Sequence, residues 1–182
     1  DLHSFPTRRS SDLYAKQENY TKIHDYIFVI TDNLSTTDPM DTGSSVLSSL
    51  LYQKKQQAGR LGISCDIDIQ ISHVAIDDFS ITTIIGNLFD NAITAAQKCS
   101  SPWVRASLSQ SGSYLELTID NCHCEKIKEK NGEFATTKKD KNLLHGIGIK
   151  NVRKVVSDLN GQIDICYTDD TFHVNILLPN YE

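Results

Sequence analysis

Long apolar runs and a basic excess are both missing from this 182-residue sequence. No apolar stretch approaches the roughly 18 residues needed to cross a bilayer, so no membrane contact is expected from these residues. Lys and Arg number 18 against 23 Asp and Glu, which gives a formal net charge of −5. Without a visible basic face, nucleic acid is not an expected partner.

Cysteine is sparse, and its five residues do not form a disulfide-like framework. An odd number of unframed cysteines is typical of a reducing compartment, so free thiols are expected. Cys122-His-Cys124 suggests a metal site. Ligands so close together do not easily wrap one tetrahedral zinc, and no second Cys/His pair follows at finger spacing, so structural zinc is disfavoured.

The first 60 residues divide into a leader and two helical stretches. Residues 1–13 have no periodicity and resemble a translated sequencing adapter; a disordered native tail is the alternative, and no function is expected of either. Helical spacing runs from Tyr14 to about Leu34, stops at Thr36-Thr-Asp-Pro39, and resumes from Ser44 to Ala58. Gly59 and Gly62 then end the second helix.

The remaining residues predict an α+β fold, a two-layer sandwich. Strict alternation over Ile63–Ile71 predicts a half-buried strand, and a helix with an apolar stripe follows from Ser80 to Lys98. Two hairpins flank a second helix. The predicted segments are the hairpin Trp103–Leu108 and Tyr114–Ile119, a long polar stretch Cys122–Leu144, the helix Ile149–Leu159 capped by Asn160-Gly161, and the closing hairpin Gln162–Tyr167 and Phe172–Leu178. The sum is a five-stranded, mainly antiparallel sheet with helices on one face.

Two asparagines share a polar face of the Ser80–Lys98 helix. Asn87 and Asn91 stand four residues apart, and Thr94 and Lys98 continue the same face. An ordinary helix border is one interpretation. A nucleotide–metal site is the other, because buried amides need polar partners and an amide oxygen is a hard ligand suited to Mg²⁺.

A second polar signal is the pair Gly146 and Gly148, which precedes the helix predicted from near Ile149. Bare backbone lets an anion approach closely, and a helix N-terminus offers free N–H groups and a positive dipole end. A plain loop-to-helix turn is the alternative interpretation.

These motifs resemble those of the GHKL superfamily, which includes gyrase-type topoisomerases, chaperone ATPases, mismatch-repair ATPases and histidine kinases. Gly86-Asn-Leu-Phe-Asp-Asn-Ala-Ile93 is similar to the N box of the kinases, and His145-Gly-Ile-Gly-Ile-Lys-Asn-Val152 to their second glycine box. Thr136-Thr-Lys138 resembles the lid, and Asn121 stands where other kinases carry the aspartate of D-x-G-x-G. The subgroup that this chain most resembles is the peptide-sensing, quorum-sensing-receptor-like kinases, from about Tyr14 to the end.

The resemblance implies a Bergerat-type sandwich that binds ATP and Mg²⁺. It makes Asn91 the metal ligand and places Asn87 at the phosphates or at the water shell of the metal. Gly146, Gly148 and Ile149 would bind the phosphates. Asp90 would order the helix or a water molecule beyond the direct ligands of the metal.

The side-chain oxygen of Asn121 would accept a hydrogen bond from the adenine amino group, and an amide oxygen accepts such a bond less strongly than a carboxylate does. The glycine box usual after this residue is replaced by Cys122-His-Cys-Glu125, a departure that implies looser adenine recognition. Thr137 and Lys138 would contact nucleotide from the lid, with Lys138 at the γ-phosphate; a solvated lysine is the alternative for Lys138.

The residue four before Asn91 favours a kinase over a hydrolase. ATP-hydrolysing branches carry a glutamate there that activates water, whereas Asn87 cannot take a proton at neutral pH. Phosphoryl transfer to histidine needs positioning and electrostatics rather than such a base. Asn87 and Lys138 are therefore the candidate catalytic residues. The alternatives are a stand-alone serine kinase of the anti-sigma type and a degenerate nucleotide-binding or dimerisation module.

The resemblance also implies an organisation: residues 1–13 as leader, 14–60 as a partial dimerisation helix with a linker helix, and 61–182 as the catalytic domain. His24-Asp-Tyr26 resembles a phosphoacceptor box, but it lies too close to Asn91, so a bundle-surface role is expected and the acceptor helix is expected upstream. The parent would be a membrane-anchored bacterial homodimer whose catalytic part faces the cytoplasm and passes phosphate to a response regulator.

Overall fold

The computed structural model describes residues 40–124, 128–130, 133–135 and 147–181, and the predicted Tyr14–Leu34 helix and His24 lie outside them. All the described residues belong to one compact unit. Its elements are α2 (Ser45–Arg60), β1 (Ser64–Gln70), α3 (Asp78–Ala96), β2 (Trp103–Ser111), β3 (Tyr114–Cys122), β4 (Lys128–Lys130), β5 (Glu133–Ala135), α4 (Ile147–Asp158), β6 (Gln162–Tyr167) and β7 (Thr171–Pro179).

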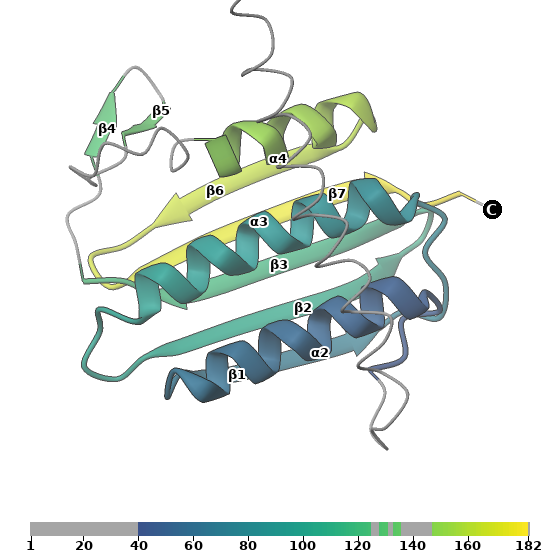
Figure 1. Cartoon of the computed structure of the whole chain (residues 1–182). Helices are drawn as coiled ribbons and strands as arrows, with labels where there is room; N and C mark the ends of the chain where they lie inside the picture. The colour runs from purple at the N-terminus through teal and green to yellow at the C-terminus, as the bar shows by residue number, and fades with distance from the viewer. Residues whose placement is uncertain (1–39, 125–127, 131–132, 136–146, 182) are drawn as a thin grey trace, which may run out of the picture. The chain divides into compact units, whose positions relative to one another are not determined.

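Five strands form one mixed sheet in the order β1-β2-β3-β7-β6 (Figure 1). β1 and β2 are parallel, as the crossover through α3 requires, and the other three pairings are antiparallel. The α+β prediction with a mainly antiparallel sheet is confirmed. Within the long polar stretch Cys122–Leu144, β4 and β5 pair as a short antiparallel ribbon that the sequence patterns did not indicate.

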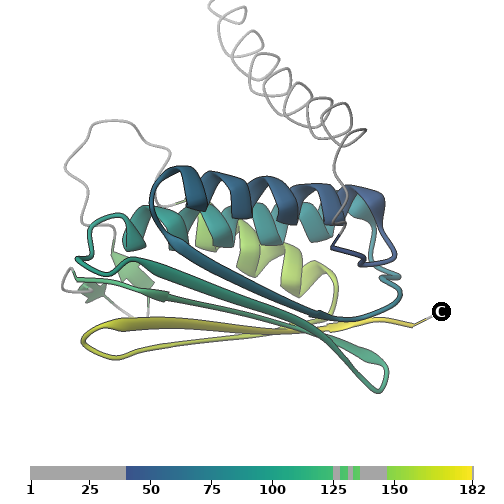
Figure 2. The ribbon, with the colours of Figure 1, turned by 90° about the horizontal axis from the view of Figure 1, so that it is seen from below.

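Helices α2, α3 and α4 cover one face of this sheet, and Figure 2 shows the two layers edge-on. α3 lies between the other two helices and packs on both, as well as on β2 and β3. α3 is buried beyond its predicted stripe, since Phe89 and Ile93 are buried too. Among the described residues, no helix is long and apolar enough to span a membrane.

Local signals place the helix ends. Ser44 caps α2 by accepting the Leu47 N–H at 3.2 Å, and Asp77 caps α3 by accepting the Ser80 N–H at 2.9 Å. Hydrogen bonds from Ser80 hold the pKa of Asp77 below its usual value. Asn160, with φ of 56°, ends the last helix in the left-handed conformation.

The start of α4 differs from the prediction. The helix begins at Ile147 rather than near Ile149, so Gly148 lies in its first turn. The fold therefore places Gly148 on the surface of α4 that faces α3. The domain boundary at residue 61 stays a prediction, although α2 packs against α3 and β1.

Candidate functional site

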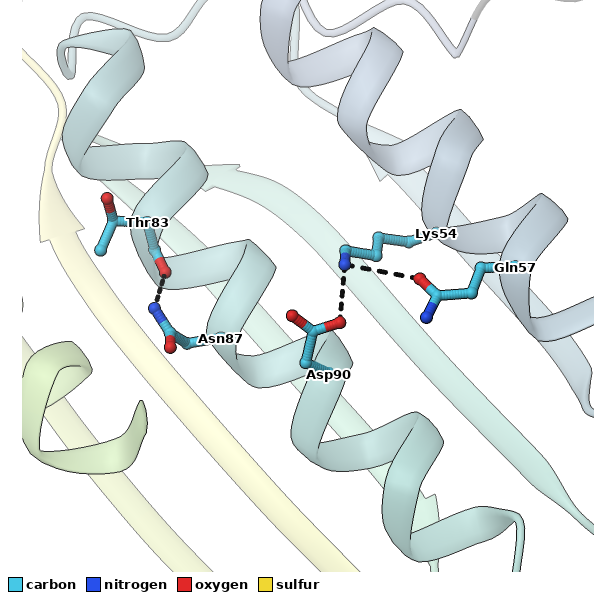
Figure 3. A network of polar contacts seen from close by, with 5 residues as sticks. All are labelled: Lys54, Gln57, Thr83, Asn87 and Asp90. Carbon is cyan, nitrogen blue, oxygen red and sulfur yellow. Dashed lines mark hydrogen bonds and ion pairs between the residues drawn. The ribbon is translucent and has the colours of Figure 1, made fainter. Parts of the chain in front are cut away.

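Asn87 is oriented by the helix that carries it. Its Nδ2 donates to the carbonyl of Thr83 at 2.7 Å, one turn earlier on α3 (Figure 3). A backbone carbonyl can only accept, so the amide nitrogen is fixed on that side and Oδ1 is the atom left to face a ligand. The side chain is partly exposed, and it presents a hard oxygen at the helix surface.

Asn91 and Gly148 meet Asn87 at the contact between α3 and α4. A Cβ built on Gly148 would lie 3.3 Å from Asn91 Nδ2, 3.6 Å from Asn91 Oδ1 and 3.4 Å from Asn87 Oδ1. The two asparagines and the glycine therefore converge, although β2 and β3 lie between them in the chain. Glycine leaves that space open, whereas any side chain would fill the gap between the two amides.

The first turn of α4 stands at this convergence. The initial N–H groups of a helix have no partner within the helix, and they lie at its positive dipole end. Gly148 leaves the backbone of that turn uncovered on the side of Asn87 and Asn91. Ile149 is half-buried and packs against the core, so it anchors the turn. The arrangement suits an anion held together with a hard cation.

Asn121 comes to the same end of the sandwich from the sheet. It is the penultimate residue of β3, only 3% exposed, and its Nδ2 donates to the carbonyl of Cys122 at 2.8 Å. Its neighbours across the sheet are Val104 and Phe172. The C-terminal ends of β3 and α3 lie close together, because Cys124 Sγ is 3.1 Å from the carbonyl oxygen of Lys98.

The structure does not extend to every predicted site residue. Thr137, Lys138 and Gly146 lie outside the described residues, so their assigned contacts stay predictions. No group of three or more His, Cys, Asp or Glu side chains within the described ranges could hold a metal ion. The amide oxygens of α3 are compatible with Mg²⁺, which usually takes only one or two protein ligands and completes its shell with water and phosphate.

Two contributors were not expected from the sequence. Thr83 orients Asn87 through its main chain, and the i, i+4 spacing on one helix is the signal that could have identified it. Lys54 of α2 forms a 2.7 Å ion pair with Asp90, and its side chain is only 12% exposed (Figure 3). Asp90 thus contacts the neighbouring helix, in agreement with a role in ordering α3.

Comparison with known proteins identifies one family. The family model described as the GHKL domain matches residues 76–179, more than half of the chain. This match includes α3, the hairpin, α4 and the closing strands. No curated protein sequence matches the chain significantly.

Solved structures share the fold at low identity. The catalytic domain of histidine kinase ThkA, in a nucleotide-free form, is 17% identical with a TM-score of 0.58, over 74% of this chain and 92% of that one. The mycobacterial sensor histidine kinase MprB is 17% identical with a TM-score of 0.56, over 79% and 98%. The Acinetobacter baumannii histidine kinase AdeS is 15% identical with a TM-score of 0.56, over 99% and 88%.

Proposed function

Because the chain belongs to the GHKL domain family, we propose that it is the ATP-binding catalytic domain of a sensor histidine kinase. It transfers the γ-phosphate of ATP to a histidine on a helix that precedes the described residues, for relay to a response regulator. One observation carries the proposal: Asn87 and Asn91 converge on the bare backbone of Gly148. The similar solved structures are histidine kinases, which supports the choice of reaction.

Each residue of the convergence has a task. Asn91 supplies an amide oxygen to the Mg²⁺ that neutralises the triphosphate, and Asn87 Oδ1 binds the phosphates or the metal-bound water. Gly148 and the first turn of α4 receive phosphate oxygens on their N–H groups. Asn121 recognises the adenine amino group. Thr137, Lys138, Gly146 and Ile149 complete the nucleotide contacts.

The chemistry at Asn87 favours transfer over hydrolysis. Its amide nitrogen is bonded to the Thr83 carbonyl, and its oxygen cannot accept a proton at neutral pH. Water in this position would therefore lack a general base. A histidine acceptor needs no such base, because its neutral imidazole is already a nucleophile and the domain has only to position the phosphate.

The same proposal includes the partners and the setting. The parent protein acts as a homodimer through helices that precede the catalytic domain, and it is anchored in a bacterial membrane with this domain on the cytoplasmic side. Within the sensor kinases, its motifs most resemble those of the peptide-sensing subgroup. These parts rest on the motif resemblance set out above.

Titration calorimetry with Mg·ATP tests the binding step directly. The wild-type chain is expected to release or absorb measurable heat, and Asn91→Ala to lose most of the affinity. Omitting Mg²⁺ should weaken wild-type binding strongly but leave Asn91→Ala almost unchanged, since the variant lacks the metal ligand. Absence of any heat with the folded wild-type protein would refute nucleotide binding and favour a degenerate module.

Transfer is tested separately with the parent protein. Full-length kinase given radiolabelled ATP should acquire acid-labile, base-stable label, as phosphohistidine does. Acid-stable label on a serine of a partner protein would instead identify a serine kinase of the anti-sigma type.

A further inference from the structure

Three thiols gather where the ends of α3 and β3 meet. Cys99 follows α3, Cys122 is the last residue of β3, and Cys124 lies two residues beyond. Cys124 Sγ donates to the carbonyl of Lys98 at 3.1 Å, which is the carbonyl bonded to the nitrogen of Cys99. The Cys99 thiol donates to the carbonyl of Ala95 at 3.8 Å, and the thiols of Cys122 and Cys124 lie near enough to contribute to the rise of its pKa. All three are free thiols in the structure.

The three thiols differ in access. Cys122 is 6% exposed, and its Sγ accepts the Trp103 N–H at 3.2 Å and lies 3.6 Å from the Trp103 carbonyl oxygen. Cys99 is half-buried against the core, whereas Cys124 is exposed. A reagent in solution therefore meets Cys124 first. Of the other two thiols, Cys122 is engaged by Trp103 of β2, whereas Cys99 directly follows the carbonyl that Cys124 contacts.

A metal centre does not account for this cluster. In the part of the chain that the structure describes, no set of three or more His, Cys, Asp or Glu is arranged to hold a metal ion. His123, which separates two of the cysteines, directs its Nε2 to the carbonyl of Thr168 at 3.0 Å, and its backbone N–H donates to Asp170. The ring is thus engaged by the β6–β7 turn.

We propose that Cys124 and Cys99 form a reversible disulfide pair that exchanges with low-molecular-weight disulfides. The Cys124 thiolate attacks a small disulfide RSSR, forms a mixed disulfide and expels one thiolate RS⁻. The Cys99 thiol then loses its proton and attacks Cys124 Sγ, which forms the Cys99–Cys124 bond and expels the second RS⁻. Two protein thiols are oxidised, one small disulfide is reduced to two thiols, and no other reactant is needed.

The order of the two steps follows from the surroundings of Cys99. Burial, together with the neighbouring thiol of Cys122, raises the pKa of Cys99 to about 12, so this thiol is protonated at neutral pH and reacts slowly with reagents. Charge on Cys124 also contributes to that rise. Cys124 carries no charge once it is in a mixed disulfide, so the first step removes one of the causes that raise the pKa of Cys99 and hinder its deprotonation in the second step.

The new bond would join the C-terminal end of α3 to the chain just beyond β3. Asn121 lies three residues before Cys124, and Asn91 lies on the helix that Cys99 follows. The pair would therefore tie together two elements that carry proposed nucleotide contacts. Its formation requires only the thiols and does not depend on the proposed kinase function.

Peptide mapping by mass spectrometry tests the pair. Reduced, folded wild-type chain incubated with oxidised glutathione should yield a Cys99–Cys124 cross-linked peptide with two hydrogens lost, which a dithiol reductant reverses. Cys99→Ser should stop at a glutathione adduct on Cys124, and Cys124→Ser should leave Cys99 unmodified. Cys166→Ser removes an exposed thiol on β6 and is the matched control, with the cross-link unchanged.

Two outcomes would overturn the proposal. One is a wild-type protein that accumulates the glutathione adduct on Cys124 at equilibrium without any cross-link. The other is a cross-link that joins Cys124 to Cys122 and leaves Cys99 free. A short pulse of iodoacetamide before oxidation measures how fast each thiol reacts. Cys124 should be alkylated about tenfold or more faster than Cys99, and equal rates would contradict the proposal that Cys124 reacts first.

Discussion

Replacing Gly148 by alanine is the most direct perturbation of the convergence between α3 and α4. The added Cβ would lie 3.3 Å from Asn91 Nδ2 and 3.4 Å from Asn87 Oδ1, which is tighter than ordinary van der Waals contact. The amides can yield by a few tenths of an ångström, and alanine gains about 1 kcal/mol over glycine in a helix. The free energy of unfolding should therefore change by about 1 kcal/mol or less in either direction.

Nucleotide affinity should respond much more than stability. The methyl group of the Gly148→Ala variant covers the backbone that faces the two amides and displaces them, so Mg·ATP affinity should fall about tenfold or more, equivalent to about 1.4 kcal/mol. Calorimetry measures the affinity, and urea unfolding shows that the variant is folded.

Gly59→Ala is the matched control. Gly59 is also in a helix, α2, and a Cβ there meets nothing within 4 Å. This variant should be as stable as wild type or about 1 kcal/mol more stable, with unchanged affinity. A folded Gly148→Ala protein that binds Mg·ATP as tightly as the control would refute the assignment of this surface to the phosphates.

Four further outcomes are expected. Asp77→Ala should lower the free energy of unfolding by about 1 kcal/mol at pH 7, because α3 loses its cap. The folded state lowers the pKa of Asp77 from its unfolded value of 3.8, so the stabilisation by this carboxylate is complete above pH 3.8. Urea titrations of the wild-type protein should show that stabilisation being lost as the pH falls through the folded-state pKa. Gly161→Ala should cost about 1–3 kcal/mol in the same assay, since its Cβ would lie 2.7 Å from a backbone oxygen of β7; stability equal to wild type would contradict the close contact. Asp90→Asn should cost about 1 kcal/mol or less, as an exposed partner in an ion pair does, and should leave the calorimetric Mg·ATP affinity intact; a large loss of affinity would assign Asp90 to the nucleotide instead. The 182-residue chain should bind Mg·ATP without autophosphorylation, and radiolabel at His24 after incubation with labelled ATP would overturn the expectation that its acceptor helix lies upstream.

Hydrophobic periodicity in the sequence located the helices and strands, because the pattern within each helix or strand depends only on which of its own sides faces the core. The alternation of β1 and the stripe of α3 both follow from which side of that element meets the core, so Ile81 and Leu88 could be assigned to the interior from the sequence. Phe89 and Ile93 could not be assigned in this way. Their burial widens the apolar face beyond that stripe, as is expected of a helix that packs on other helices as well as on the sheet.

The candidate site was harder to predict because its geometry lies between elements. The sequence separately indicates an amide face on α3 and a bare turn before α4, but the packing of the two helices decides whether they meet. A shift of two residues in the start of α4 moved Gly148 from the expected loop into the helix. In that position a Cβ built on the glycine would lie 3.4 Å from Asn87 Oδ1, an approach that a plain loop-to-helix turn would not require.

Asn87 illustrates how a residue can be restricted chemically by a contact that its type does not predict. Any residue at this position would lie one turn before Asn91, but only a donor can bond the Thr83 carbonyl and still present an oxygen on its other side. A glutamate has no donor at neutral pH, so it would have to turn away from that carbonyl and toward solvent or ligand. A carboxylate could not make the hydrogen bond that fixes the amide, so this ordinary main-chain contact within one helix supports the proposed preference for phosphoryl transfer over hydrolysis.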